Sequence, residues 1–206
     1  EWLIDPSFLS REYGQAIPRY LRGPAAHNAF VLPDAPYAIT PGLAALSGRR
    51  TDRGFRFDGQ HSAVPGCLFR RSIEGATTEL ALQFADELRA DAGGTIQPSD
   101  ARLMFHCGEG VTVAQDGAEV RLTHPASDLA VILSLPPGST IRFFQGQEDG
   151  PTRGITGLGF LQTRAITTIE IEAAQAGQIR WTLRAVPKSE VCGTGHDAGR
   201  RDNAAP

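Results

Sequence analysis

The clearest structural signal in the chain is the stretch Val111-Thr112-Val113-Ala114-Gln115-Asp116-Gly117-Ala118-Glu119-Val120-Arg121-Leu122. Apolar and polar residues alternate on both sides of Asp116-Gly117, and a period of two residues is typical of strands with one buried face. The Asp-Gly pair suits the positive φ angles of a tight two-residue hairpin turn. The stretch therefore predicts an antiparallel β-hairpin.

The same alternation recurs along most of the chain after residue 27. Turn-rich stretches such as Pro136-Pro137-Gly138 separate the alternating segments. About ten or more short strands at this spacing predict an all-β fold, an antiparallel β-sandwich of two packed sheets. Besides the hairpin, strands are expected at residues 30–32, 54–57, 67–73, 129–133, 140–144, 165–171 and 178–185.

Three regions carry mixed signals. Residues 78–88 alternate but are rich in good helix formers, and we favour a strand. Residues 11–22 have apolar residues at helical spacing, yet Gly14 weakens the first turn and Pro18 removes a backbone donor. We expect a surface loop there, or at most a short broken helix. Residues 41–47 are a second possible site of helix.

The length and the end of the chain define its organisation. A chain of 206 residues is long enough for one domain with a full core, and we expect a single β-sandwich over residues 1–187. Apolar residues almost disappear after that point, which predicts a disordered polar tail over 188–206. Glu1 is not a methionine and is followed by strand-like sequence, so we expect the chain to be a fragment or a processed product.

Charge and composition exclude several classes of protein. Twenty basic and 23 acidic residues leave a formal charge of −3 without a dense basic run, so nucleic acid is not expected as a partner. No run of about 18 apolar residues is present, which argues against a membrane span. Three widely spaced cysteines without a CxxC motif predict neither a zinc ribbon nor a disulfide framework. Cys67 and Cys107 are expected to be buried apolar residues on strands.

Several segments, in order along the chain, resemble signatures of the heparinase II/III-like polysaccharide lyases. Near the start, Trp2-Leu3-Ile4-Asp5-Pro6 resembles WLIDPG and Ala25-Ala26-His27-Asn28-Ala29 resembles AAHNT. The resemblance covers about residues 1–185 and departs from the family pattern at Ser7, where Gly is usual, and at Phe69, where a His often precedes the arginine pair. Its further pieces are Phe57-Asp58-Gly59-Gln60-His61, Leu68-Phe69-Arg70-Arg71, Leu103-Met104-Phe105-His106 and Gln178-Ile179-Arg180-Trp181-Thr182-Leu183.

Asp5 and His27 are the candidate metal ligands. The resemblance implies that they help to hold zinc at the seam between a helical catalytic domain and a β-domain. Two ligands do not make a site, because protein zinc sites need three or four, and the resemblance places a further His upstream of Glu1. Asn28 is expected to orient the imidazole as a second-shell partner. From residue types alone, a turn residue is the better explanation of Asp5 and a core histidine that of His27; only the resemblance favours metal ligands.

His61, Arg70 and Arg71 are the candidate substrate contacts. Elimination from a uronic acid requires the substrate carboxylate to be neutralised, and arginine forks suit carboxylates and sulfates. If residues 67–73 form a strand, one of the two adjacent arginines must point outward. The alternatives are a solvated strand face for the arginines and a polar loop position for His61.

The resemblance implies that this chain is the β-domain of a lyase that cleaves acidic polysaccharide by β-elimination. Its partners would be the polysaccharide and an N-terminal helical catalytic domain, and its location periplasmic or secreted. The proton-carrying tyrosine belongs to the helical domain, so the isolated chain is expected to be inactive. Two alternatives stay open: a non-catalytic carbohydrate-binding β-sandwich, which the aromatic content of 7% does not favour, and a cupin-like metal enzyme, whose short-spaced ligand cluster is missing.

Overall fold

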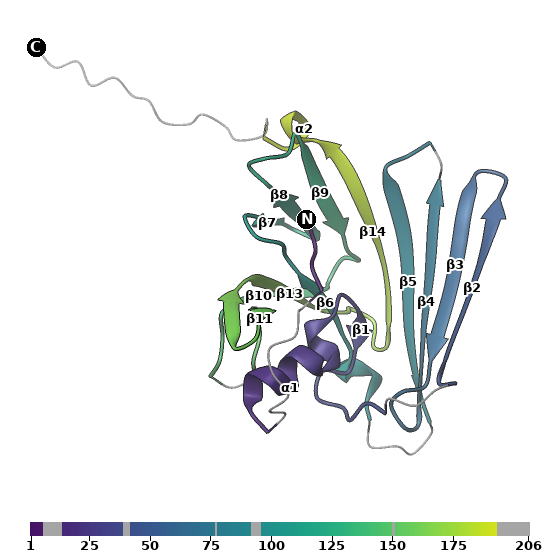
Figure 1. Cartoon of the computed structure of the whole chain (residues 1–206). Helices are drawn as coiled ribbons and strands as arrows, with labels where there is room; N and C mark the ends of the chain where they lie inside the picture. The colour runs from purple at the N-terminus through teal and green to yellow at the C-terminus, as the bar shows by residue number, and fades with distance from the viewer. Residues whose placement is uncertain (6–13, 39–41, 77, 92–95, 150, 193–206) are drawn as a thin grey trace, which may run out of the picture.

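The computed structural model describes residues 1–5, 14–38, 42–76, 78–91, 96–149 and 151–192, and within this part the chain is mostly β. Its largest element is an antiparallel sheet of eight strands (Figure 1). In spatial order these are β2 (Ala44–Thr51), β3 (Gly54–His61), β4 (Cys67–Ala76), β5 (Ala81–Ala90), β14 (Gln178–Pro187), β9 (Leu129–Ser134), β8 (Glu119–Thr123) and β7 (Thr112–Asp116).

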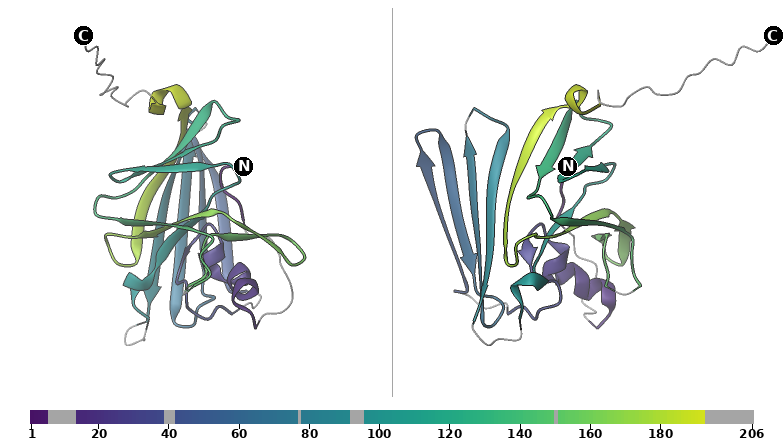
Figure 2. Two further views of the ribbon diagram at one scale, coloured as in Figure 1. Left: turned by 90° about the vertical axis from the view of Figure 1, so that its left-hand side faces the viewer. Right: turned by 180° about the vertical axis from the view of Figure 1, so that it is seen from behind.

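A smaller antiparallel sheet packs against one part of the large one (Figure 2). Its strands, in spatial order, are β1 (Phe30–Val31), β6 (Arg102–His106), β13 (Thr167–Glu172) and β10 (Thr140–Gln145). The remaining elements are the ribbon of β11 (Ile155–Gly159) and β12 (Gln162–Ala165), the helices α1 (Ala16–Arg22) and α2 (Lys188–Cys192), and the 3-10 turns η1 (Pro24–Ala26) and η2 (Pro98–Asp100).

The main core lies between the two sheets, because alternate residues of each strand point toward the other sheet. From the small sheet, Leu103, Phe105 and Ile169 point inward, and from the large sheet Leu133 and Trp181 meet them. The opposite face of the small sheet is covered by α1 and η1, which bury a second cluster. Its members are Tyr20, Leu21, Ala25, Ala26 and Ile155.

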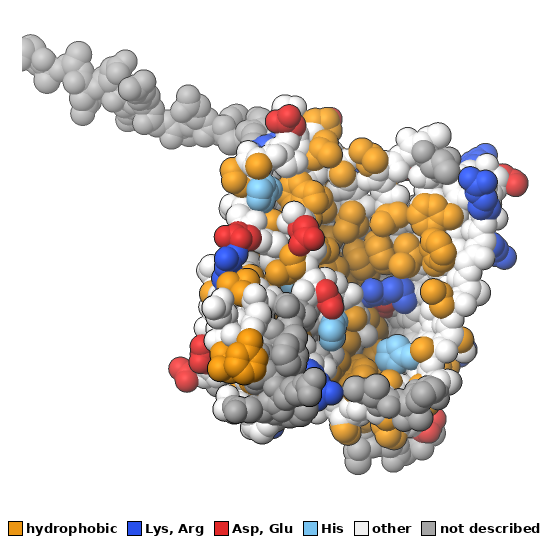
Figure 3. Space-filling model, viewed as in Figure 1, with side chains coloured by type: hydrophobic (Ala, Val, Ile, Leu, Met, Phe, Trp, Pro, Cys, Tyr) orange, Lys and Arg blue, Asp and Glu red, His pale blue; other side chains and the backbone are white. Residues whose placement is uncertain are grey.

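The large sheet extends beyond the small one, so part of its inner face is uncovered. The hollow between the small sheet and the wall formed by β2 to β5 is lined by apolar side chains (Figure 3). Leu46 and Phe57 belong to this face by register and are 78% and 44% exposed. A face of this kind is typical of a surface that another protein segment covers.

Most strand predictions are confirmed. The predicted hairpin is β7–β8, with Gly117 at a φ of +58°, and residues 81–90 form β5, so the mixed segment at 78–88 is a strand. The two cysteines predicted to be buried, Cys67 and Cys107, are both buried and free. The predicted two-sheet β-sandwich is therefore correct.

Three predictions on helix and tail need correction. The loop expected over residues 11–22 was wrong for its second half, which forms α1. Pro18 is the third residue of α1, and the first four N–H groups of a helix have no intrahelical partner, so its missing donor costs nothing there. Residues 44–51 form the strand β2, so the possible helix at 41–47 was also wrong.

The disordered tail predicted over 188–206 was wrong for residues 188–192, which form the short helix α2. The rest of that tail, residues 193–206, lies outside the described residues. None of the helices in the described part of the chain has the length and apolar character needed to cross a bilayer.

Candidate functional site

Asp5 and His27 meet, although 22 residues separate them in the sequence. Nδ1 of His27 lies 2.8 Å from Oδ1 of Asp5, in hydrogen-bond contact. Asp5 follows a segment that is fixed to β6, since Ile4 N–H donates to the His106 carbonyl at 2.9 Å. His27 caps η1 in an extended conformation just before β1. Both side chains remain open to solvent, with exposed fractions of 66% for Asp5 and 43% for His27.

Asn28 ties the two segments together. Its side-chain amide donates to the Ile4 carbonyl at 2.9 Å, and its Oδ1 accepts from the His106 N–H at 2.8 Å. These bonds fix the backbone on both sides of the Asp5–His27 pair. Asn28 thus acts on the main chain that carries the pair, whereas the predicted action on the imidazole itself stays a prediction.

The side chains of Asp5 and His27 have the chemistry and the spacing to supply two of the ligands of a zinc site. Zinc takes carboxylate oxygen and imidazole nitrogen at about 2.0–2.2 Å, which places tetrahedral ligand atoms about 3.3 Å apart. The 2.8 Å contact would have to open by about half an ångström, and the exposure of both side chains permits that. Among the residues that the structure describes, no group of three metal-ligating side chains occurs. A zinc site built on Asp5 and His27 would therefore need a third ligand from outside the described residues.

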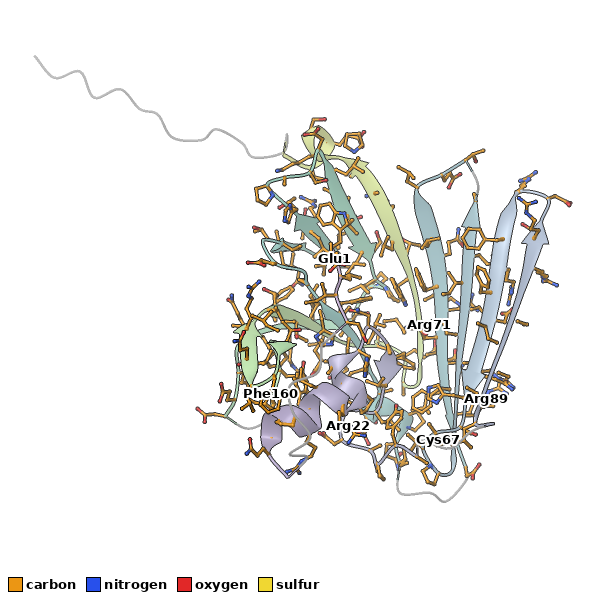
Figure 4. All side chains as sticks on the ribbon, in the orientation of Figure 1. Glu1, Arg22, Cys67, Arg71, Arg89 and Phe160 are labelled. Carbon is orange, nitrogen blue, oxygen red and sulfur yellow. The ribbon has the colours of Figure 1, made fainter. Side chains whose placement is uncertain are left out.

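Arg71, labelled in Figure 4, projects from the inner face of the large sheet and reaches the Asn28 carbonyl. Its Nε and Nη2 donate to the two oxygens of Asp86 at 2.6 and 3.1 Å, and Nη1 donates to the Asn28 carbonyl at 3.4 Å. Asp86 is 4% exposed and also accepts from the Trp181 indole N–H at 2.8 Å. Arg71 therefore connects a buried carboxylate to the segment that carries His27.

Arg70 points to the opposite, outer face, as strand alternation requires. Its neighbours across the ladder are Gln60 on β3 and Glu87 on β5. The structure therefore separates the two arginines that the sequence places side by side. Only Arg71 shares a face with Asp5 and His27.

His61 ends β3 and lies against Phe69, the residue that departs from the family pattern. The two rings stack with centroids 4.6 Å apart and planes 12° apart. The Ala63 N–H donates to Nδ1 of His61 at 3.4 Å, and burial lowers the pKa of the imidazole. A neutral ring whose Nδ1 accepts a hydrogen bond carries its proton on Nε2, so His61 is a hydrogen-bond donor at that atom.

His27 and His61 line the same hollow. Its volume is about 880 Å³, and it lies between the α1–η1 segment, β1 and the adjoining ends of β2 and β3. Small apolar side chains form most of the wall, while Arg19, Arg22 and Tyr37 add polar groups. Arg22 is labelled in Figure 4 beside α1. The hollow is large enough to receive a ligand or a side chain of another domain.

Two buried polar residues near the site were not predicted. His106 is fully buried, with Nδ1 2.9 Å from the Thr168 hydroxyl and no hydrogen-bond partner for Nε2 among the described residues. Burial, reinforced by the nearby His27, lowers the pKa of His106 to about 4. Asp86 is the other. A signal for it existed, because a carboxylate interrupts the inward-facing series Leu82, Phe84, Leu88 on β5.

Comparison with solved structures identifies the fold of this chain. No protein-family model matches the sequence, and no curated protein gives a significant match. Solved structures do match this chain. One of them is a heparan sulfate lyase HepC mutant from Pedobacter heparinus, which matches 90% of this chain with a TM-score of 0.69 at 11% identity. The chain has the fold of a heparinase III segment.

Other heparinase III structures support the same conclusion, with TM-scores of 0.67 and 0.65 at 13% and 14% identity. They are matched over 92% and 90% of this heparinase-like chain. The chain spans only 28–29% of the length of these structures. The resemblance seen in the sequence is thus confirmed for the fold.

Proposed function

We propose that this heparinase-like chain is the β-sandwich of a polysaccharide lyase that cleaves acidic, uronate-containing polysaccharide by β-elimination. One observation carries the proposal: Asp5 and His27, which the family resemblance pairs as metal ligands, lie 2.8 Å apart in a chain with a heparinase III fold. The match over 90% of the chain supports it. The domain would supply two metal ligands and one wall of the substrate cleft.

The uncovered inner face supports a helical catalytic domain as the partner. Exposed apolar side chains such as Leu46 and Phe57 lie on it, and the matched structures are more than three times as long as this chain. A helical domain placed against this face would cover the apolar surface and close the hollow beside His27 and His61. The third metal ligand would come from that part of the protein.

In the elimination itself, the β-domain would bind and orient the substrate. Removal of the C5 proton of a uronate leaves negative charge on its carboxylate, and hydrogen-bond donors stabilise that charge. His61 presents Nε2–H to the hollow, and Arg71 keeps the His27 segment in place through Asn28. Zinc, when bound, would supply positive charge and hold the domains together at the seam.

The test uses the full-length protein with its upstream sequence. Cleavage of uronate polymers is followed by absorbance of the unsaturated product, and bound zinc is measured in parallel. Asp5→Ala and His27→Ala are expected to lower zinc content to below half and to reduce cleavage. His124→Ala, which removes a half-buried imidazole outside the Asp5–His27 site, is the control. Full zinc content in both site variants would refute the metal assignment.

The same experiment distinguishes the lyase from the alternative, a non-catalytic carbohydrate-binding module. If the full-length protein binds polysaccharide without cleaving it, and Asp5→Ala and His27→Ala leave binding unchanged, the module replaces the lyase. A periplasmic or secreted location is part of the proposal, since an acidic polysaccharide is met outside the cytoplasm. Fractionation of cells that express the full-length protein would test it.

A further inference from the structure

The outer face of the large sheet holds a second hollow, on the side away from Asp5 and His27. Its volume is about 1120 Å³ and it spreads over β3, β4, β5 and β14. Arg70 and Arg180 both line it. In the view from behind, these strands form one continuous twisted wall (Figure 2, right).

The strand register fixes how the two arginines are placed. Arg70 pairs across the ladder with Glu87, which pairs with Gln178 on β14. Arg180 lies two residues further along β14 and pairs with Ala85 on β5. Two strand spacings and one two-residue step separate their Cβ atoms by about 12 Å. Ala85, the small residue beside Arg180, leaves the floor between the two arginines open.

The acidic side chains of this hollow are already paired. Arg56 binds Asp58 at 2.8 Å and Glu74 at 2.5 Å, and Arg89 binds Glu87 at 2.7 Å.

The fourth carboxylate, Asp86, is held by Arg71 from the inner face. Arg70 and Arg180, in contrast, have no ion-pair or hydrogen-bond partner among the described residues, and both are exposed. Arg56 holds two of the four carboxylates, so five arginines and four carboxylates leave a net local charge of +1. The two guanidinium groups that are free to bind an anion are those of Arg70 and Arg180.

We infer that this hollow is an accessory binding groove for an acidic polysaccharide, with Arg70 and Arg180 each taking a carboxylate or sulfate of the polymer. A guanidinium fork binds both groups in a bidentate way. Two such forks about 12 Å apart match charges repeated along a chain better than one small anion. Gln178 lies in the same row as Arg70, and Gln83 and Thr182 form the row beyond Arg180; all three line the groove and supply donors and acceptors for hydroxyl groups.

The groove is separate from the Asp5–His27 site because the two lie on opposite faces of the same sheet. It would hold the polymer near the enzyme while another part occupies the cleft. The nature of the polymer rests on the proposed function. The presence of the groove is independent of the proposed function, because it follows from the strand register and from the unpaired arginines that line it.

Binding of defined oligosaccharides to this chain tests the inference. A sulfated heparan-type oligosaccharide, a carboxylated polyuronate oligosaccharide and a neutral glucan are titrated calorimetrically. Binding of one or both acidic probes, no binding of the neutral one, and weakening by added salt are expected. Which acidic probe binds tells sulfate from carboxylate recognition. Arg70→Gln with Arg180→Gln should weaken binding about tenfold, since each exposed ion pair contributes about a factor of three.

Arg164→Gln with Arg142→Gln is the matched control, because it removes the same two positive charges from exposed positions on β12 and β10 that do not line the groove. Equal loss in the control and in the double variant of Arg70 and Arg180 would indicate diffuse attraction and overturn the inference, as would unchanged binding in the latter. A second measurement needs no variant: the Nε–H resonances of Arg70 and Arg180 should shift on titration, and shifts confined to other arginines would also refute the groove.

The two proposals fail separately. Loss of binding in the arginine variants with no cleavage by the full-length protein would keep the groove and remove the lyase. Cleavage that depends on Asp5 and His27, with unchanged binding in the arginine variants, would support the lyase and refute the groove.

Discussion

Acid should destabilise this chain through His106. The imidazole is fully buried on β6, and its pKa falls from an ordinary value of 6.5 to about 4 in the folded chain. Below pH 6.5 the unfolded chain therefore binds a proton that the folded chain excludes, so stability falls as the pH falls toward 4. Above pH 6.5 the ring is neutral in both states and contributes no pH dependence.

The size of the effect follows from the shift. About 2.5 pKa units at 1.36 kcal/mol each give about 3 kcal/mol once the pH is below 4, and about 2 kcal/mol of this is lost by pH 5. For a domain with a total stability of about 5–15 kcal/mol this is a large fraction. The main cause is desolvation by burial, reinforced by the nearby His27; backbone groups of Ala25 and His27 and the charge of Asp5 offset only part of it.

Urea unfolding at pH 8, 7, 6 and 5 measures this loss in the wild type and in His106→Gln. The variant should be less stable at pH 8, because it loses packing, but its decrease between pH 8 and pH 5 should be about 2 kcal/mol smaller. His124→Gln, which removes a histidine that is only half-buried, should keep the wild-type decrease. The argument is refuted if wild type and His106→Gln lose the same free energy of unfolding over this range.

Two further predictions concern the inner ion pair and the glycine turns. Arg71→Gln leaves the Asp86 carboxylate buried with Trp181 as its remaining donor, and because Arg71 is itself partly exposed we expect a loss of about 2–3 kcal/mol. Arg70→Gln, one residue away on the outer face, should change the free energy of unfolding by less than about 0.5 kcal/mol, and equal losses would contradict this. Gly117→Ala should cost about 1 kcal/mol, since its φ is +58° and the space around it is open. Gly177→Ala should lower the free energy of unfolding by clearly more, because the added Cβ would lie 2.9 Å from the Leu88 carbonyl oxygen and 2.7 Å from Cβ of Pro98. Thermal unfolding of the two glycine variants measures the difference. An equal loss of stability in both variants would contradict the predicted clash.

The sequence by itself was enough for the local β-structure and for the faces of each strand. Alternation along β4 already required Arg70 and Arg71 to point to opposite sides, because successive side chains of a strand do so in any sheet. The hairpin at Asp116-Gly117 was also predictable, but the two-residue loop lies one residue later, at Gly117 and Ala118, because Asp116 pairs with Glu119. Gly117 takes the positive φ of +58°, which glycine adopts without steric cost. The pairing of Asp5 with His27 was reached through the family resemblance.

Helix α1 shows where local signals were insufficient. Gly14 and Pro18 argued against a helix, but Pro18 falls in the first turn and Tyr20 and Leu21 are buried against Ile155. Tertiary burial therefore outweighs a weak intrinsic preference, as it does for most short helices.

Only the tertiary structure decided which strands are neighbours, and with it the site. Asp86 meets Trp181 because β5 pairs with β14, 95 residues away in the sequence. The hydrogen-bond ladder between strands is the same for any sequence, so no local pattern specifies this partner. Burial of the inner face of the large sheet against the small sheet specifies it. The Arg71–Asp86–Trp181 contact, the buried His106 and the two arginines of the outer groove all depend on that choice.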